Sequence, residues 1–338
     1  MGRSSAPIAL PTPARPYCER DALAFRIARE RFAFALEATG TDSRILVGTA
    51  VNVDSIRWSR VVPGMQEVNR MRCLNLVLGL FVGLIVSLGN GNAANDQAIE
   101  DALRGTFRLT KGSASGTAFL VSLENRDNAK GKKHVLVTAA HVFDDLKGTD
   151  CTLVMRGPGK DGIIVRKEIT LTIRDGKKPL WVKHPDVHVA ALGVDLPDGV
   201  DFKAFRLDQI ADEKWATERK VRVGRDVCIP CFPAQVEANE AGWPILRKGS
   251  IATHPLTPLA SAKTMFVDYS HFGGDSGAPV VLHGEKEPIV VGLVIAMQRQ
   301  TDKSTTPFEE RTVHTPLGLA IAVQSPFILQ TIEMLQKK

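Results

Sequence analysis

A serine set between glycines is the residue of this chain best suited to act as a nucleophile. Ser276 lies in a Gly-Asp-Ser-Gly segment at 274–277. Glycines at 274 and 277 permit a tight turn in which the N–H groups of Gly274 and Ser276 point at one spot. Such paired donors form an oxyanion hole, which stabilises the negative oxygen of a tetrahedral intermediate. The segment predicts acyl transfer, although a serine in a glycine turn is by itself more often ordinary turn chemistry.

A histidine and an acid precede this serine in the chain. His141 ends a Thr-Ala-Ala-His segment that follows an apolar, β-branched run, and Asp186 precedes another apolar run at 189–192. A serine hydroxyl needs a base within hydrogen-bonding reach, and the base needs a group that holds its tautomer. We therefore predict Ser276 as the nucleophile, His141 as the general base and Asp186 as the acid that orients it.

The two segments and their order resemble the chymotrypsin-like (trypsin-fold) serine peptidases, in particular the compact bacterial type without a PDZ domain. Thr-Ala-Ala-His stands at 138–141 and Gly-Asp-Ser-Gly at 274–277, and the resemblance extends from about Gly105 to Ile332. It implies a serine endopeptidase that cleaves peptide or protein substrates through an acyl-enzyme, with no metal or organic cofactor. An α/β-hydrolase would have its acid and histidine after the serine, which excludes that class.

The rest of the chain after residue 95 predicts an all-β fold, because short apolar segments alternate with Gly, Pro, Asp and Lys. The expected strands are 116–123, 134–138, 151–156, 163–173, 188–194, 221–229, 265–268, 278–282 and 289–296. The resemblance implies two six-stranded antiparallel barrels, near 100–205 and 215–322, with the active site between them. Apolar residues at helical spacing in 325–338 predict a C-terminal helix that packs on the second barrel.

The position of the acid has two candidates. In the family that this chain resembles, the acid directly precedes an apolar-Ala-apolar strand, and here His188 stands at that place. Side chains of a strand alternate with a period of two, so positions 186 and 188 are expected to face the same way. We favour Asp186, because a histidine lacks the anionic acceptor that orients His141. If His188 holds the position, the alternative is a catalytically weakened or inactive trypsin-fold protein that acts as a peptide-binding module.

The segment 71–94 predicts export. It begins with Met71-Arg72, continues with an apolar run at 74–88 and ends in small residues, as a secretory signal peptide does. We therefore expect a peptidase domain at 95–338 that is periplasmic or secreted. If the run 74–88 is retained, it would be a membrane anchor. Residues 1–70 form an extension without an evident role, and one hypothesis is that translation starts after them.

Charge and cysteines bear on other functional classes. The composition, 44% apolar and 24% charged, is that of an ordinary globular protein, and the net charge is +6. Residues 1–73 hold eleven arginines and seven acidic residues, a net charge of +4. The remainder is therefore close to neutral, and no nucleic-acid partner is expected.

Cys228 and Cys231 have redox-motif spacing but lie in an expected strand. Together with Cys151 they therefore indicate a structural disulfide or buried thiols. His184, Asp186 and His188 stand at alternate positions and could be zinc ligands, but the sequence does not show the further ligand that such a site needs.

Overall fold

The computed structural model describes residues 96–338 except 124–133, 219 and 307. The predicted extension at 1–70 and the signal peptide or anchor at 71–94 lie outside the described residues. Within the described ranges, none of the helices has the length and apolarity that a membrane crossing needs.

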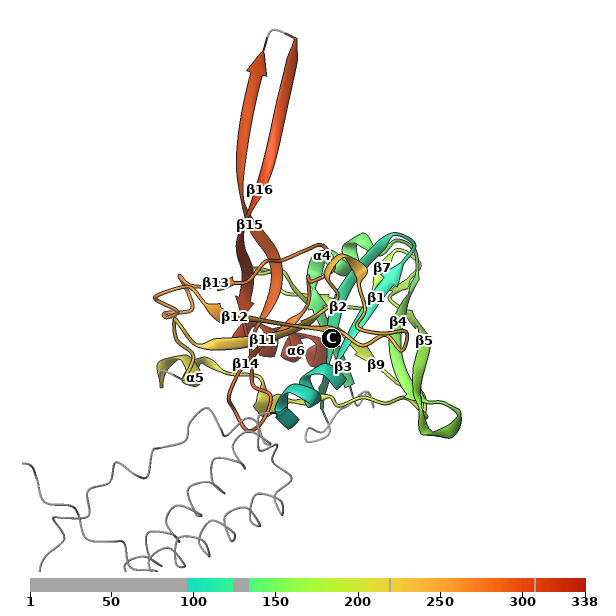
Figure 1. Ribbon diagram of the computed structural model, residues 1–338. Coiled ribbons are helices and arrows are strands. Elements are labelled where there is room, and N and C mark those ends of the chain that lie inside the picture. The colour runs from blue at the N-terminus through green and yellow to red at the C-terminus, as the bar shows by residue number, and fades with distance from the viewer. Residues whose placement is uncertain (1–95, 124–133, 219, 307) are drawn as a thin grey trace, which may run out of the picture. The chain divides into compact units, whose positions relative to one another are not determined.

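The first half of the described chain is a single sheet of eight strands in the order β5-β4-β1-β2-β3-β9-β8, with β10 parallel to β2 (Figure 1). Among the described residues no ladder joins β5 to β8, so the sheet is not the closed six-stranded barrel that was expected. A helical segment at 96–104 precedes it. The strands are β1 (Thr106–Lys111), β2 (Ala114–Ser122), β3 (His134–Ala139), β4 (Asp150–Pro158), β5 (Ile164–Thr172), β8 (Val182–Lys183), β9 (Val189–Val194) and β10 (Phe205–Arg206).

Short elements connect these strands. Helix α4 (Ala140–Asp145) follows β3 directly and carries His141. The other connecting elements are the 3-10 helices η4 (Lys160–Gly162) and η5 (Leu207–Gln209), the two-stranded ribbon of β6 (Arg174–Asp175) and β7 (Lys178–Pro179), and helix α5 (Glu213–Thr217).

The second half is the closed six-stranded barrel that was predicted, in the order β11-β12-β13-β16-β15-β14. Alternate residues of β11, namely Val227, Ile229 and Cys231, point into the barrel core, as the period of two requires. The elements are β11 (Asp226–Cys231), η6 (Pro233–Gln235), β12 (Ile245–Ile251), β13 (Thr264–Asp268), β14 (Pro279–Leu282), β15 (Val290–Thr306), β16 (Glu309–Gln324) and α6 (Pro326–Lys337). The structure thus confirms the all-β class and the C-terminal helix.

The C-terminal helix α6 packs differently from the prediction. Its buried residues Phe327, Ile328 and Ile332 belong to the apolar cluster of the first sheet, which also takes in outward-facing residues of the second barrel. The His184 ring, at the end of β8, lies 5.5 Å from the Phe327 ring and 3.0 Å from the Gln330 side chain. The helix therefore packs on the apolar cluster of the first sheet, which also reaches the second barrel, whereas we expected it to pack on the second barrel.

Strands β15 and β16 continue far beyond the barrel. They pair from Gly292 with Gln324 out to Thr306 with Glu309, and residues 299–316 form a two-stranded ribbon that we call the arm. Figure 1 shows the arm standing away from the barrel. We expected a strand only over 289–296, because the arm is polar and lacks the apolar alternation that predicts a half-buried strand.

Candidate active site

Ser276 and His141 line one cavity of about 580 Å³. His141 comes from α4 of the first half, and Ser276 from the turn before β14 of the second. The wall is completed by residues 113–115 and Asp145 from the first half and by Ala234, Gln235 and 272–274 from the second. The structure therefore brings the predicted nucleophile and the predicted base to one site between the halves.

The turn around Ser276 requires glycine for steric reasons. Gly274 and Gly277 have φ values of +99° and +92°, which glycine adopts without strain. A Cβ on Gly274 would lie 2.3 Å from the Phe232 carbonyl oxygen. A Cβ on Gly277 would lie 1.9 Å from the carbonyl oxygen of Thr117 on β2. The second glycine thus lets the serine turn of one half approach a strand of the other.

Gly277→Ala is expected to destabilise the fold by about 3 kcal/mol or more, because a left-handed alanine and a backbone clash add up. Gly284→Ala is the matched control, since Gly284 has φ +84° and no atom lies within 4 Å of the position that an alanine Cβ would take. Gly284→Ala should lower the free energy of unfolding by only about 1–2 kcal/mol, which is the cost of a left-handed alanine without a clash. Urea unfolding of both variants measures the difference. Equal losses would show that the approach of Thr117 does not constrain the turn.

Three carbonyl groups of the serine turn are held by donors outside it. The Ala234 N–H donates to the Gly273 oxygen at 2.6 Å. Thr117 supplies the other two bonds, from Oγ1 to the Gly274 oxygen at 2.7 Å and from its N–H to the Ser276 oxygen at 2.9 Å. In a trans peptide the N–H points opposite to the C=O, so holding the Gly273 oxygen fixes the direction of the Gly274 N–H.

The N–H groups of Gly274 and Ser276 have no acceptor among the described residues. That is the condition expected of donors kept for an oxyanion. The neighbouring Asp275 is fully buried, and its carboxylate accepts the Phe272 N–H at 2.9 Å. Its own N–H donates to the Phe272 oxygen at 3.1 Å, so Asp275 shapes the turn from within.

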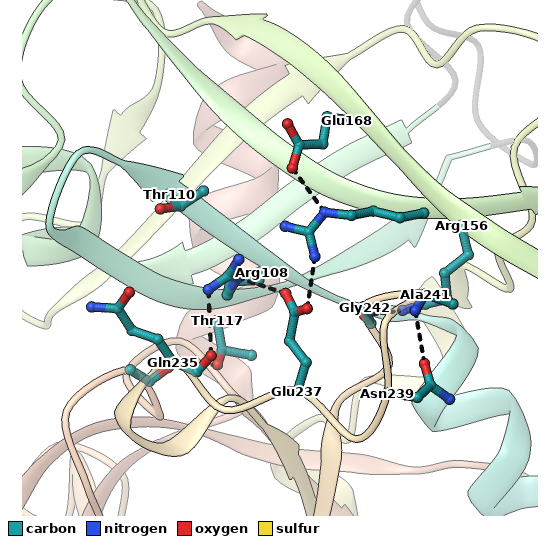
Figure 2. A network of polar contacts seen from close by, with 12 residues as sticks. Arg108, Thr110, Thr117, Arg156, Glu168, Gln235, Glu237, Asn239, Ala241 and Gly242 are labelled. Atoms are coloured by element: carbon teal, nitrogen blue, oxygen red, sulfur yellow. Dashed lines mark hydrogen bonds and ion pairs between the residues drawn. The ribbon is translucent and has the colours of Figure 1, made fainter.

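The loop that supplies Ala234 is fastened to the first sheet by ion pairs (Figure 2). Ala234 and Gln235 have φ values of +48° and +67°, a strained conformation for residues other than glycine. Two residues later, Glu237 forms ion pairs with Arg108 on β1 at 2.9 Å and with Arg166 on β5 at 2.6 Å. Strained backbone persists where surrounding contacts determine it, and these pairs are such contacts.

These supporting residues were not predicted from the sequence. Thr117, Gln235 and Glu237 act through partners more than a hundred residues away or through ion pairs between halves. The only signal for Thr117 was its place in a Gly-Thr-Ala segment before the histidine, and no local pattern marked Glu237.

The surroundings of His141 favour the neutral form of its imidazole. Burial lowers the pKa of His141 below its ordinary value of 6.5, and nearby Asp145 opposes this shift. The charge of His188 lowers the pKa further. The Ser276 hydroxyl contacts the Ile295 carbonyl oxygen at 3.5 Å, and no hydrogen bond joins it to His141 in the described part of the chain. Both side chains thus line one cavity, and the lowered pKa of His141 favours a neutral imidazole.

The structure does not place the predicted acid beside this base. Asp186 lies in the turn between β8 and β9, where its N–H donates to the His184 ring at 3.1 Å. Its carboxylate is exposed and pairs with Lys263 at 3.3 Å, and Asp186 is not among the charged groups that act on His141. Positions 186 and 188 do not share the face of a strand, because β9 begins only at Val189.

His188 and Asp145 are the neighbours of His141 instead. The His188 carbonyl oxygen accepts the N–H of Ala140, the residue before His141, at 3.1 Å. Asp145 stands four residues after His141 on α4 and lines the cavity. The sequence did contain that signal, since residues four apart share a helix face, but no helix was expected there.

Among the described residues, no three His, Cys, Asp or Glu side chains come together as a group that could hold a metal ion, and His184, Asp186 and His188 do not form one. Cys151, Cys228 and Cys231 are free and buried. Burial raises the pKa of the Cys151 thiol to about 12, so it stays protonated. Of the two alternatives weighed for the cysteines, buried thiols are the observed one.

No family model matches the chain, and no curated protein matches it. Similar solved structures include Rv3671c from M. tuberculosis H37Rv in an inactive form, at 14% identity and a TM-score of 0.41, over 71% of this chain and 91% of that chain. Another is an inactive form of the Rv3671c protease, at 14% identity and a TM-score of 0.40, and the match covers 72% of this chain and 94% of that chain.

Proposed function

We propose that the protein is an exported serine endopeptidase. The observation that supports this most is the meeting of Ser276, His141 and the glycine turn in one cavity. The turn needs its glycines, and its two N–H groups have no acceptor among the described residues. Such an arrangement suits the hydrolysis of a peptide bond in an extended polypeptide. The export of the protein rests on the segment 71–94, which lies outside the described residues.

The proposed reaction uses these groups alone. Ser276 Oγ attacks the peptide carbonyl carbon while His141 takes the hydroxyl proton. The N–H groups of Gly274 and Ser276 donate to the oxyanion. His141 then returns the proton to the leaving amine, and the acyl-enzyme forms. Water, deprotonated by His141, then attacks the ester carbonyl carbon. The acyl C–O bond breaks, the acid leaves, and His141 returns the proton to Ser276 Oγ.

Labelling of the purified protein with a fluorophosphonate probe tests the proposal. Such a probe phosphonylates a serine that is activated by a base, so one equivalent of label is expected on Ser276. If the protein takes up no label over hours while its melting temperature shows that it stays folded, the proposal of an enzyme is wrong.

The pH dependence of kcat/KM follows from the pKa of His141. The imidazole must be neutral to accept the proton, so activity rises with pH through its pKa, and the midpoint is expected below 6.5. Asp145→Asn removes the largest charge that raises this pKa, so the midpoint should move lower. Asp144→Asn is the control, and its shift has the same sign but is smaller. A midpoint above 6.5, or one that Asp145→Asn leaves in place, would contradict the assignment of His141.

A second candidate function is a catalytically weakened peptidase that serves as a peptide-binding module. One observation favours it. At the start of β9, where the acid was expected, His188 borders His141, and the ring of His141 has no hydrogen-bond partner among the described residues. A triad without its anionic acceptor loses about four orders of magnitude in turnover. This candidate predicts peptide binding in the cavity with very slow labelling.

A further inference from the structure

The orientation of the peptide between Gly273 and Gly274 depends on one hydrogen bond from outside the turn. Glycine on both sides lets this peptide rotate with little steric restraint, and no atom lies within 4 Å of the place that a Cβ on Gly273 would take. Within the described residues, the Gly273 oxygen accepts a hydrogen bond only from the Ala234 N–H. Loss of that bond would release the Gly274 N–H, which is one of the two oxyanion donors.

Ala234 is held in place by contacts that its loop makes with the first sheet. The Gln235 side chain donates to the Ser113 oxygen at 3.3 Å, and the Gln235 oxygen accepts a hydrogen bond from Arg108 at 3.4 Å. Ala234 and Gln235 both have the left-handed backbone that is unfavourable for residues other than glycine. Contacts farther along the loop must therefore oppose its relaxation.

Glu237 supplies the charged contacts of this loop (Figure 2). Its carboxylate lies between Arg108 on β1 and Arg166 on β5. The side chains of Glu237 and Arg108 are only 15% and 13% exposed, so water and salt screen this pair less than a surface pair. Within the described part of the chain, Glu237 is the residue that forms an ion pair with Arg108, so its charge fastens the loop to β1.

The far end of the loop is fixed separately. Arg156 on β4 is fully buried, donates to the Gly242 oxygen at 3.2 Å and lies 4.3 Å from the centre of the Trp243 ring. A Cβ on Gly242 would lie 2.7 Å from the Val154 side chain, so this end of the loop rests directly on the sheet. Glu237 is therefore the anchor of the near end, next to the serine turn.

We propose that Glu237 is a positioning residue for the reaction: its two ion pairs keep Ala234 bonded to the Gly273 oxygen and so direct the Gly274 N–H toward the oxyanion. This inference rests on the proposed function and makes the oxyanion hole dependent on a contact between the two halves. Glu237 does not line the cavity. Its loss therefore weakens the transition state and leaves the residues around the substrate in place.

Glu237→Gln tests the proposal, because the amide keeps the shape of the side chain and removes its charge. A peptide substrate is first obtained by mapping one cleavage site in casein, an unfolded polypeptide. With this peptide, kcat and kcat/KM should fall by the same factor, at least about tenfold, since an oxyanion donor acts only in the transition state. Kinetics equal to those of the wild type would overturn the proposal, as would a rise in KM at unchanged kcat.

Glu168→Gln is the matched control. Glu168 pairs with the same Arg166 at 2.8 Å, but it lies on β5 and its side chain is 57% exposed. Because an exposed pair contributes little, kcat of this variant should stay within about twofold of the wild type. If Glu168→Gln lowers kcat as much as Glu237→Gln does, the charge of the sheet sets the rate and the positioning role of Glu237 is wrong.

Arg108→Gln removes the other partner of the more buried pair. It should lower kcat by a factor similar to that of Glu237→Gln, and the double variant should lose little more, because both changes break one contact. Losses that multiply in the double variant would mean that the two side chains act separately, which overturns the proposal. If Glu237→Gln melts below the assay temperature, Arg108→Gln carries the kinetic test, and an unchanged kcat in it overturns the proposal.

The orientation of the peptide separates this inference from the proposed function. Crystal structures of Glu237→Gln and Glu168→Gln should show the bond from Ala234 to the Gly273 oxygen lost in the first variant and kept in the second. If this difference holds while the wild type cleaves nothing, Glu237 positions the peptide and the peptidase proposal fails. If the wild type cleaves and the bond persists in both variants, Glu237 does not position the donor and this inference fails.

Discussion

Ser276→Ala is expected to abolish fluorophosphonate labelling and to lower kcat by about four to six orders of magnitude. The hydroxyl of Ser276 is the nucleophile of the proposed reaction, and alanine leaves no oxygen to form the acyl-enzyme. Alanine fits the turn, because only the hydroxyl is removed from a buried position. The melting temperature should therefore stay close to that of the wild type, and labelling and turnover are measured on the folded variant.

Ser115→Ala is the matched control for this experiment. Ser115 lines the same cavity, and its hydroxyl has no hydrogen-bond partner among the described residues. It has neither the glycine turn nor the flanking N–H groups, so its removal should leave labelling within about twofold of the wild type. Labelling that persists in Ser276→Ala and disappears in Ser115→Ala would assign the nucleophile to Ser115.

His188→Asp is expected to raise kcat by as much as about four orders of magnitude, the factor that the anionic acceptor of such triads contributes. His188 borders His141, and an aspartate there would accept the second ring N–H and stabilise the imidazolium. It would also raise the pKa of His141, so the midpoint of the pH profile should move upward. Steady-state kinetics of the wild type and the variant, from about pH 5 to about pH 9, measure both effects.

Two other variants decide which group orients His141 if His188→Asp has no effect. Asp186→Asn is expected to retain nearly full activity, because the Asp186 carboxylate is exposed and pairs with Lys263. Loss of activity by orders of magnitude in Asp186→Asn would instead restore the assignment made from the sequence. Loss confined to Asp145→Asn would assign the role to the carboxylate on α4, one turn beyond His141.

Local rules of the sequence determined much of this protein. Gly274 and Gly277 are recognisable as turn residues because their conformation is a property of the glycine backbone. The strands can be found because residues that face a core alternate with a period of two. His141 and Ser276 stand out as a pair by their surroundings, and the structure brings them to one cavity.

Features that depend on contacts between distant segments became known only from the tertiary structure. The neighbour of His141 depends on where β9 begins, and a shift of a residue or two there moves Asp186 out of the site. Thr117 and Glu237 hold the serine turn across the two halves, a role with no local pattern. The arm escaped prediction because its strands face no core and so carry no apolar alternation. The open form of the first sheet within the described residues and the packing of α6 also depend on which surfaces meet, and the sequence of one segment does not record its partner.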